Sequence, residues 1–188
     1  MKRLFACLAL SAGLLCAAAA SAQVVLLKTS VGDIRVALDA QNAPKTTANF
    51  LQYVKAGQYD GEIFHRVIGS FMIQTGGYTA DLKPKPVRAS IPLESRNGLL
   101  NLRGSIAMAR TNDPNSATSQ FFINVVDNPM LDAANSQDGN GYAVFGQVIA
   151  GMDVVDKIRA VQTHSVSVFQ NLPLTPITIL KASVEKQR

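Results

Sequence analysis

Residues 64–77 read FHRVIGSFMIQTGG, and this stretch decides the fold. Two short apolar runs flank a Gly-Ser pair, which is typical of two strands joined by a turn. Arg66 lies in the first run and Gln74 in the second. Because successive side chains of a strand point to opposite faces, Gln74 shares a face with Met72. The stretch therefore predicts a strand pair with a cation and an amide on an otherwise apolar surface.

A second stretch of the same character follows later in the chain. It consists of AMAR at 107–110 and SQFFIN at 119–124. Within a strand, Gln120 and Phe122 share a face. Both stretches together predict an apolar pocket edged by hydrogen-bond donors, formed by Arg66, Met72, Gln74, Gln120 and Phe122.

Outward from these stretches, the chain is rich in short strand-like segments. Pro44 suits the first turn of a helix at 44–56, and a second helix is predicted at 152–160. The segment 78–103 is rich in Pro, Lys, Asn and Gly and predicts an extended loop. Many short strands with two helices favour a closed or nearly closed β architecture, because closure removes unpaired edges. The predicted strands are 24–28, 34–38, 63–68, 71–75, 105–109, 120–125, 142–148 and 177–184.

The first 22 residues have the three-part pattern of a secretory signal peptide. Lys2 and Arg3 form a positive region, an apolar run extends to Ala20, and small residues end the segment at Ala22. We expect cleavage after Ala22, which leaves 23–188 as one domain. An uncleaved membrane anchor is the alternative, but the run is slightly short for a span of about 20 residues and no charged segment stops it.

Both cysteines lie inside this predicted signal, so we expect the secreted chain to contain no disulfide and no thiolate nucleophile. Cys16 follows Leu15, where a lipoprotein signal would have a small residue. Without Lys2 and Arg3 the 18 basic residues fall to 16 against 13 acidic ones, a net charge of +3. These charges are scattered, and prolines interrupt the densest basic stretch at 83–88, so no nucleic-acid partner is expected.

The familiar catalytic motifs are missing from the sequence. It has no Gly-rich phosphate loop and neither His-x-x-x-His nor Cys-x-x-Cys spacing, so no metal and no other cofactor is expected. With two histidines, a hydrolase triad has few partners to draw on. We expect His164 to be an exposed loop residue and His65 to be structural rather than an acid or base.

The two stretches resemble the cyclophilin family of peptidyl-prolyl cis/trans isomerases. FHRVI, FMIQTGG and SQFFI follow in that family's order, and the likeness continues through YAVFG at 142–146 and Gly151-Met152. It covers nearly the whole chain after the signal. The signal and the run AMART at 107–111 make the sequence most similar to periplasmic bacterial members. The resemblance implies a mainly β fold, a closed eight-stranded antiparallel β-barrel capped by two α-helices.

The resemblance also implies residue roles. The catalytic arginine falls on Arg66, and the glutamine that holds the substrate backbone falls on Gln74, with Gln120 as its partner in the groove. The remaining positions are the proline pocket, the backbone-contact strand and a groove position where the family has histidine: Phe71, Met72, Phe122 and Leu131; Ala109 and Arg110; and Tyr142.

Rotation about an X–Pro bond breaks no bond but must cross a barrier of roughly 18–20 kcal/mol. An isomerase needs only to bind the twisted amide better than either planar isomer. We expect Arg66 to donate to the proline nitrogen, which gains a lone pair as it becomes pyramidal, while the apolar pocket holds the ring. The expected partners are proline-containing unfolded or partly folded polypeptides in the periplasm. The secreted chain is expected to be a monomer without membrane attachment.

Some positions depart from the family pattern. Met130 stands where many cyclophilins have a tryptophan that contacts cyclosporin, and the chain has no tryptophan, so we expect weak cyclosporin binding with activity retained. Arg110 replaces a common asparagine, and the segment 132–141 is longer than usual. A glycine-rich loop found in many members is not visible in 78–103.

Two other functions remain open from the sequence. A cyclophilin-like domain could hold proline-containing segments as a chaperone without turnover, although the intact Arg66 argues against this. An envelope adaptor would need an exposed apolar patch away from the groove, or a retained anchor.

Overall fold

The computed structural model describes residues 23–186 and begins with the hairpin that the sequence predicts. β1 (Val24–Thr29) and β2 (Gly32–Leu38) pair antiparallel along their whole length. The turn places Gly32 at a φ of 136°, a conformation that side chains rarely adopt, and the Thr29 hydroxyl donates to its carbonyl at 2.6 Å. Apolar residues alternate along both strands, so one face of the hairpin is buried.

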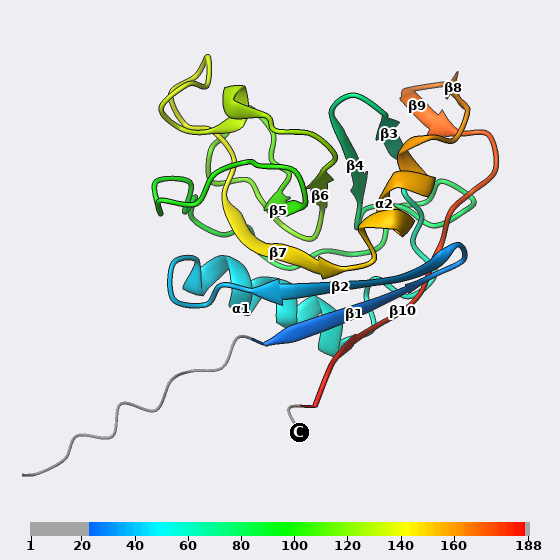
Figure 1. The fold of residues 1–188 in the computed structure, drawn as a ribbon, viewed down its shortest axis with the longest axis horizontal. Coiled ribbons are helices and arrows are strands. Elements are labelled where there is room, and N and C mark those ends of the chain that lie inside the picture. The colour runs from blue at the N-terminus through cyan, green and yellow to red at the C-terminus, as the bar shows by residue number, and fades with distance from the viewer. Residues whose placement is uncertain (1–22, 187–188) are drawn as a thin grey trace, which may run out of the picture.

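Six more strands extend this hairpin into one antiparallel sheet, which curls around the main core (Figure 1). The spatial order is β10-β1-β2-β7-β5-β6-β4-β3. The other strands are β3 (Arg66–Ile68), β4 (Met72–Thr75), β5 (Ser105–Met108), β6 (Phe121–Asn124), β7 (Val144–Ala150) and β10 (Ile179–Val184). The mainly β prediction with eight antiparallel strands and two helices is confirmed.

The prediction of a fully closed barrel overstates the closure of this sheet. Its edge strands β3 and β10 do not pair with each other. The segment before β3 contacts the start of β10 instead: Gly61 N–H donates to the carbonyl of Ile179, the first residue of β10, at 2.8 Å, and Phe64 N–H donates to the Ile177 carbonyl at 2.9 Å. The sheet is therefore a curled half-barrel whose edges meet through a short irregular segment.

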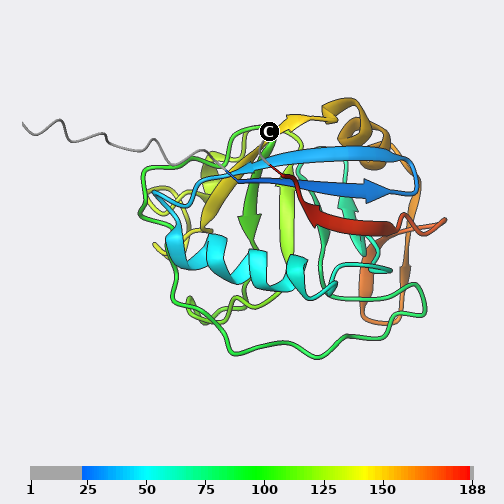
Figure 2. The ribbon, with the colours of Figure 1, turned by 90° about the horizontal axis from the view of Figure 1, so that it is seen from below.

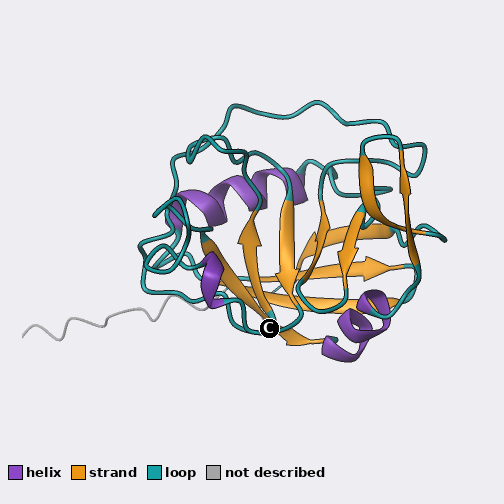
Figure 3. Ribbon diagram, turned by 90° about the horizontal axis from the view of Figure 1, so that it is seen from above, coloured by secondary structure: helices purple, strands orange, loops and turns teal. Residues whose placement is uncertain are grey.

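Two α-helices cover opposite ends of the curled sheet (Figure 3). α1 (Pro44–Lys55) and α2 (Met152–Arg159) agree with the predicted helices to within one residue at each end. The carboxylate of Glu94 accepts hydrogen bonds from the backbone N–H groups of Lys45 at 3.1 Å and Thr46 at 2.8 Å. A distant acidic residue thus satisfies the free donors of the first turn of α1 and complements the helix dipole.

The segment 78–103 contains no helix or strand, as predicted, and Figure 2 shows it passing along the outside of α1. It is held there by a hydrogen bond from Arg88 N–H to the Tyr53 hydroxyl at 2.8 Å and one from the Gln58 side chain to the Pro86 carbonyl at 3.1 Å. The loop is irregular but fixed at several points.

A second, two-stranded sheet was not predicted. β8 (Thr163–Val166) and β9 (Phe169–Pro173) form a hairpin that lies beside β3 (Figure 1). His164 is exposed, as expected, but it lies in a strand, so its assignment to a loop is wrong. All four residues of β8 are exposed, and a strand without a buried face leaves no alternating apolar pattern to detect.

The predicted signal peptide at 1–22 lies outside the described residues. Among residues 23–186, no helix is long and apolar enough to cross a membrane.

Candidate active site

β5 and β6 are buried at every residue, and β4 is buried at every residue except Gln74, so these strands carry apolar side chains on both faces. Ile73 on β4 and Phe121 on β6 point into the main core. Their neighbours Met72 and Phe122 point the opposite way and belong to a second apolar cluster. That cluster is Met72, Ala107, Phe122, Leu131 and Val144. Period-2 alternation thus supplies a core on one face and an apolar floor on the other.

A pocket of about 120 Å³ opens over this second cluster, with room for one compact ring. η1, the short 3-10 helix Pro129–Leu131, contributes Leu131 to one wall. The structure brings nine of the ten predicted site residues to this pocket: Arg66, Phe71, Met72, Gln74, Ala109, Arg110, Phe122, Leu131 and Tyr142.

Among the described residues that line the pocket, Arg66 provides the positive charge on the β3–β4 side. The register of β3 with β4 places it directly opposite Gln74. Its Nη1 lies 3.4 Å from the Gln74 Oε1 atom and 3.9 Å from the Met72 sulfur. Within the described residues Arg66 has no acidic partner. The guanidinium therefore keeps donors free beside an apolar surface, where a hydrogen bond from a charged donor is strong.

Gln120, the tenth predicted residue, does not line this pocket but lines a neighbouring hollow that it shares with Arg66. Its Oε1 atom accepts a hydrogen bond from Gln74 Nε2 at 2.8 Å. A Cβ atom at Gly77 would lie 2.7 Å from the Gln120 amide, and one at Gly76 would lie 2.7 Å from the Ser119 carbonyl. The Gly-Gly pair after β4 thus leaves the space in which Gln120 orients Gln74 and, through it, Arg66.

Arg110 has a buried guanidinium, whereas its backbone N–H and C=O groups are free to bind a ligand. Its side chain is only 4% exposed, and its Nη2 atom lies 2.5 Å from the Asp138 carboxylate. The Nε atom donates to the Gly141 carbonyl at 2.9 Å, and the guanidinium stacks over the Tyr142 ring at 4.7 Å. In the part of the chain that the structure describes, neither the backbone N–H nor the C=O of Arg110 makes a hydrogen bond. A free donor and acceptor on one residue fit a peptide lying antiparallel to it.

His65 lies next to Arg66 but faces away from the pocket. It is 6% exposed, its ring meets the Tyr78 ring edge-on at 4.9 Å, and its Nδ1 atom has no partner in the described residues. Burial lowers the pKa of His65 to about 4. The ring is therefore neutral near pH 7, which fits a structural residue.

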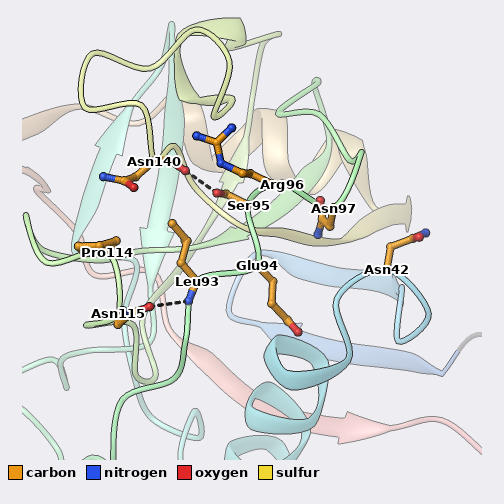
Figure 4. A pocket seen from close by; sticks show the side chains of 9 residues that line it. All are labelled: Asn42, Leu93, Glu94, Ser95, Arg96, Asn97, Pro114, Asn115 and Asn140. Carbon is orange, nitrogen blue, oxygen red and sulfur yellow. Dashed lines mark hydrogen bonds between the residues drawn. The ribbon is translucent and has the colours of Figure 1, made fainter.

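A larger hollow of about 550 Å³ lies near the start of α1 (Figure 4). Its polar groups bond to one another: Leu93 N–H donates to the Asn115 side chain at 2.9 Å, and the Ser95 hydroxyl donates to the Asn140 carbonyl (Figure 4). Arg96 donates to the Gly139 carbonyl at 2.7 Å. These contacts tie three loops together, and seven of the nine residues that line the hollow are polar, so we do not assign it to catalysis.

Sequence reasoning missed two parts of the site. Ala107 and Val144 belong to the apolar floor without lining the pocket, and the register that pairs Ala107 with both Phe122 and Val144 is the signal that would have found them. Asp138, which holds Arg110, is 28 residues away from it and carried no signal in the sequence.

An apolar pocket for one ring, a guanidinium at its mouth and an unpaired backbone beside it define a peptide-binding protein built on a curled β-sheet. The family described as cyclophilin type peptidyl-prolyl cis-trans isomerase/CLD matches residues 24–184. The chain belongs to this family and is a peptidyl-prolyl cis-trans isomerase, as the resemblance implied.

Bacterial relatives are similar over nearly their whole length. Peptidyl-prolyl cis-trans isomerase A of Dickeya dadantii is 52% identical over 170 residues, which cover 90% of this chain and 88% of that protein. Peptidyl-prolyl cis-trans isomerase B of Escherichia coli is 46% identical over 164 residues, 87% of this chain and 100% of that protein.

Solved structures share the fold. A cyclophilin-type isomerase of Cryptosporidium parvum, crystallised in the presence of the dipeptide Ala-Pro, superposes with a TM-score of 0.73 at 26% identity. The match covers 88% of this chain and 100% of that one.

Proposed function

We propose that this isomerase acts on X–Pro bonds of unfolded or partly folded polypeptides in the periplasm, by stabilising the twisted amide. The observation that carries the mechanism is the placement of Arg66, which has no acidic partner among the described residues and lines the apolar pocket. The related protein crystallised with Ala-Pro supports a prolyl ligand for this pocket.

In this proposal the prolyl ring occupies the pocket above Met72 and Phe122. Arg66 donates to the proline nitrogen only when that nitrogen is pyramidal, so the contact favours the twisted state over both planar states. Exclusion of water by the apolar walls strengthens the contact. A gain of about 7 kcal/mol accelerates exchange about 10⁵-fold, which one charged hydrogen bond plus fixed positioning can approach.

The experiment that tests the function is a prolyl isomerisation assay on the secreted chain, comparing the wild type with Arg66→Ala and Arg66→Lys. The alternative of a chaperone without turnover predicts peptide binding in all three proteins and catalysis in none.

Secretion rests on the pattern at residues 1–22. We expect the protein recovered from a periplasmic fraction to begin at Gln23, because the small residues at Ala20 and Ala22 fit a signal peptidase. Intact-mass spectrometry checks this, with a chain lacking residues 2–22 as the cytoplasmic control. A product that keeps Met1 and sediments with membranes would show an anchor instead.

Cyclosporin is expected to inhibit this enzyme weakly. Met130 stands at the tryptophan position of many family members, is 55% exposed, and offers no indole N–H. We expect Met130→Trp to lower the inhibition constant by tenfold or more, because tryptophan adds a large flat contact and a donor. A wild-type constant as low as that of the variant would contradict this expectation.

A further inference from the structure

A second hollow of about 540 Å³ adjoins the proline pocket. The two share one wall, made by Arg110, Leu131 and Tyr142. The outer boundary of the second hollow is the longer segment 132–141 together with Met130. We call it the outer hollow; its remaining lining residues are Asn112, Asn135, Ser136, Gln137 and Asp138.

The segment that forms the outer hollow is held in place by its own hydrogen bonds. Tyr142 N–H donates to the Leu131 carbonyl at 2.8 Å and closes the neck of the segment. Gly141 has a φ of 64°, and a Cβ atom there would lie 2.5 Å from the backbone nitrogen of Ala133. Asp138 accepts the N–H of residue 140 at 2.9 Å besides its ion pair with Arg110. The outer hollow is therefore formed before a substrate arrives.

The free backbone of Arg110 gives the direction of a bound peptide. Ala109 lines the proline pocket and precedes Arg110. In an antiparallel pairing that seats the prolyl residue opposite Ala109 in the pocket, the residue before proline lies opposite Arg110. Directly paired residues of antiparallel strands project their side chains to the same face. The side chain of the residue before proline thus projects to the face of the Arg110 side chain, which forms part of the wall between the proline pocket and the outer hollow.

We propose that the outer hollow is the subsite for the side chain of the residue before proline, and that it prefers a long uncharged side chain. This inference rests on the proposed function. Met130, Leu131 and Tyr142 supply apolar surface, and the other side chains around them are amides and a hydroxyl. The only charged groups in the lining, Arg110 and Asp138, neutralise each other. The subsite therefore favours neither sign of charge, and a long uncharged side chain gains most from its apolar surface.

The test uses the secreted chain and four peptides that differ only in the residue before proline: Ala, Leu, Glu or Lys. For the wild type, kcat/KM is expected to be about fivefold higher for Leu than for Ala, a discrimination of the size that a partly open apolar pocket provides. Glu and Lys peptides are expected to agree within about twofold. Met130→Ala should bring the Leu-to-Ala ratio close to one.

Met130→Glu adds a sharper readout, because it should favour the Lys peptide over the Glu peptide by about fivefold. Leu180 on β10 is 60% exposed and lies outside both hollows, so Leu180→Ala and Leu180→Glu are the matched controls and should leave every ratio unchanged. Ratios that stay the same in both Met130 variants, or that change equally in the controls, overturn the subsite while the isomerase function stands. Absence of turnover for every peptide overturns both.

Discussion

Replacing Arg66 with alanine is expected to lower kcat/KM for prolyl isomerisation by about 10²–10³-fold, the usual cost of removing one donor aimed at a transition state. The donor acts on a lone pair that exists only in the twisted amide, so the loss should fall mainly on kcat rather than KM. Arg66→Lys keeps the charge but loses the planar fork that reaches both the Gln74 Oε1 atom and the pocket. We expect it to recover only part of the rate.

The control for this experiment is a measurement of peptide binding. Arg66 is partly exposed and has no ion pair within residues 23–186, so its removal should leave the fold intact. Binding of a proline peptide to the alanine variant, by calorimetry, should weaken less than tenfold, because the apolar pocket remains. A variant that turns over substrate within twofold of the wild type would exclude Arg66 from the mechanism.

The parts of the fold predicted from sequence are those in which one buried face imposes a period. Alternation in 24–38 gave the first hairpin, and it gave the shared face of Met72 and Gln74. The resemblance then supplied residue roles that alternation alone does not. The hairpin β8–β9 was not predicted, because its first strand is exposed throughout and shows no alternation of apolar and polar residues.

The partners of polar site residues were not predictable in the same way. Nothing local in the sequence links Arg110 to Asp138, and the burial of its guanidinium depends on the Tyr142 ring. Likewise, the incomplete closure of the sheet depends on how the segment before β3 meets the start of β10, which periodicity does not encode. Long-range polar contacts and the geometry at the sheet edges can therefore be determined only from the folded structure.

Two buried ionisable residues, Glu62 and His65, predict an unusual pH dependence of stability. Glu62 is fully buried, and neither of its carboxylate oxygens has a partner in the described residues. Burial raises the pKa of Glu62 to about 7, and the charge of Lys85 opposes this only in part. The Lys85 ammonium donates instead to the carbonyls of Gln58 and Asp60, at 2.6 Å each.

His65 changes stability with pH in the direction opposite to Glu62. Its pKa falls from 6.5 to about 4 on burial, so its contribution to stability is complete above pH 6.5 and is lost as the pH falls through 4. The pKa of Glu62 rises from 4.5 to about 7, so its contribution is complete below pH 4.5 and is lost as the pH rises through 7. Between pH 4.5 and 6.5 each group changes the free energy of unfolding by about 1.4 kcal/mol per pH unit, in opposite directions.

The wild type is therefore expected to have a nearly constant free energy of unfolding from pH 4.5 to 6.5. In Glu62→Gln only the effect of His65 remains, so the free energy of unfolding of this variant should rise with pH, by about 3 kcal/mol across this range. The free energy of unfolding of His65→Gln should fall by a similar amount as the pH rises across this range. Urea unfolding at pH 4.5, 5.5 and 6.5 measures these slopes, and the double variant should be flat again. The slope is the decisive quantity, because a buried amide shifts stability at every pH alike.

The other carboxyl groups with shifted pKa values titrate below this range, since their pKa values are lowered: Asp39, Asp81, Asp138 and Asp156. Parallel slopes in the two single variants would show that burial does not shift the pKa values of Glu62 and His65 in opposite directions.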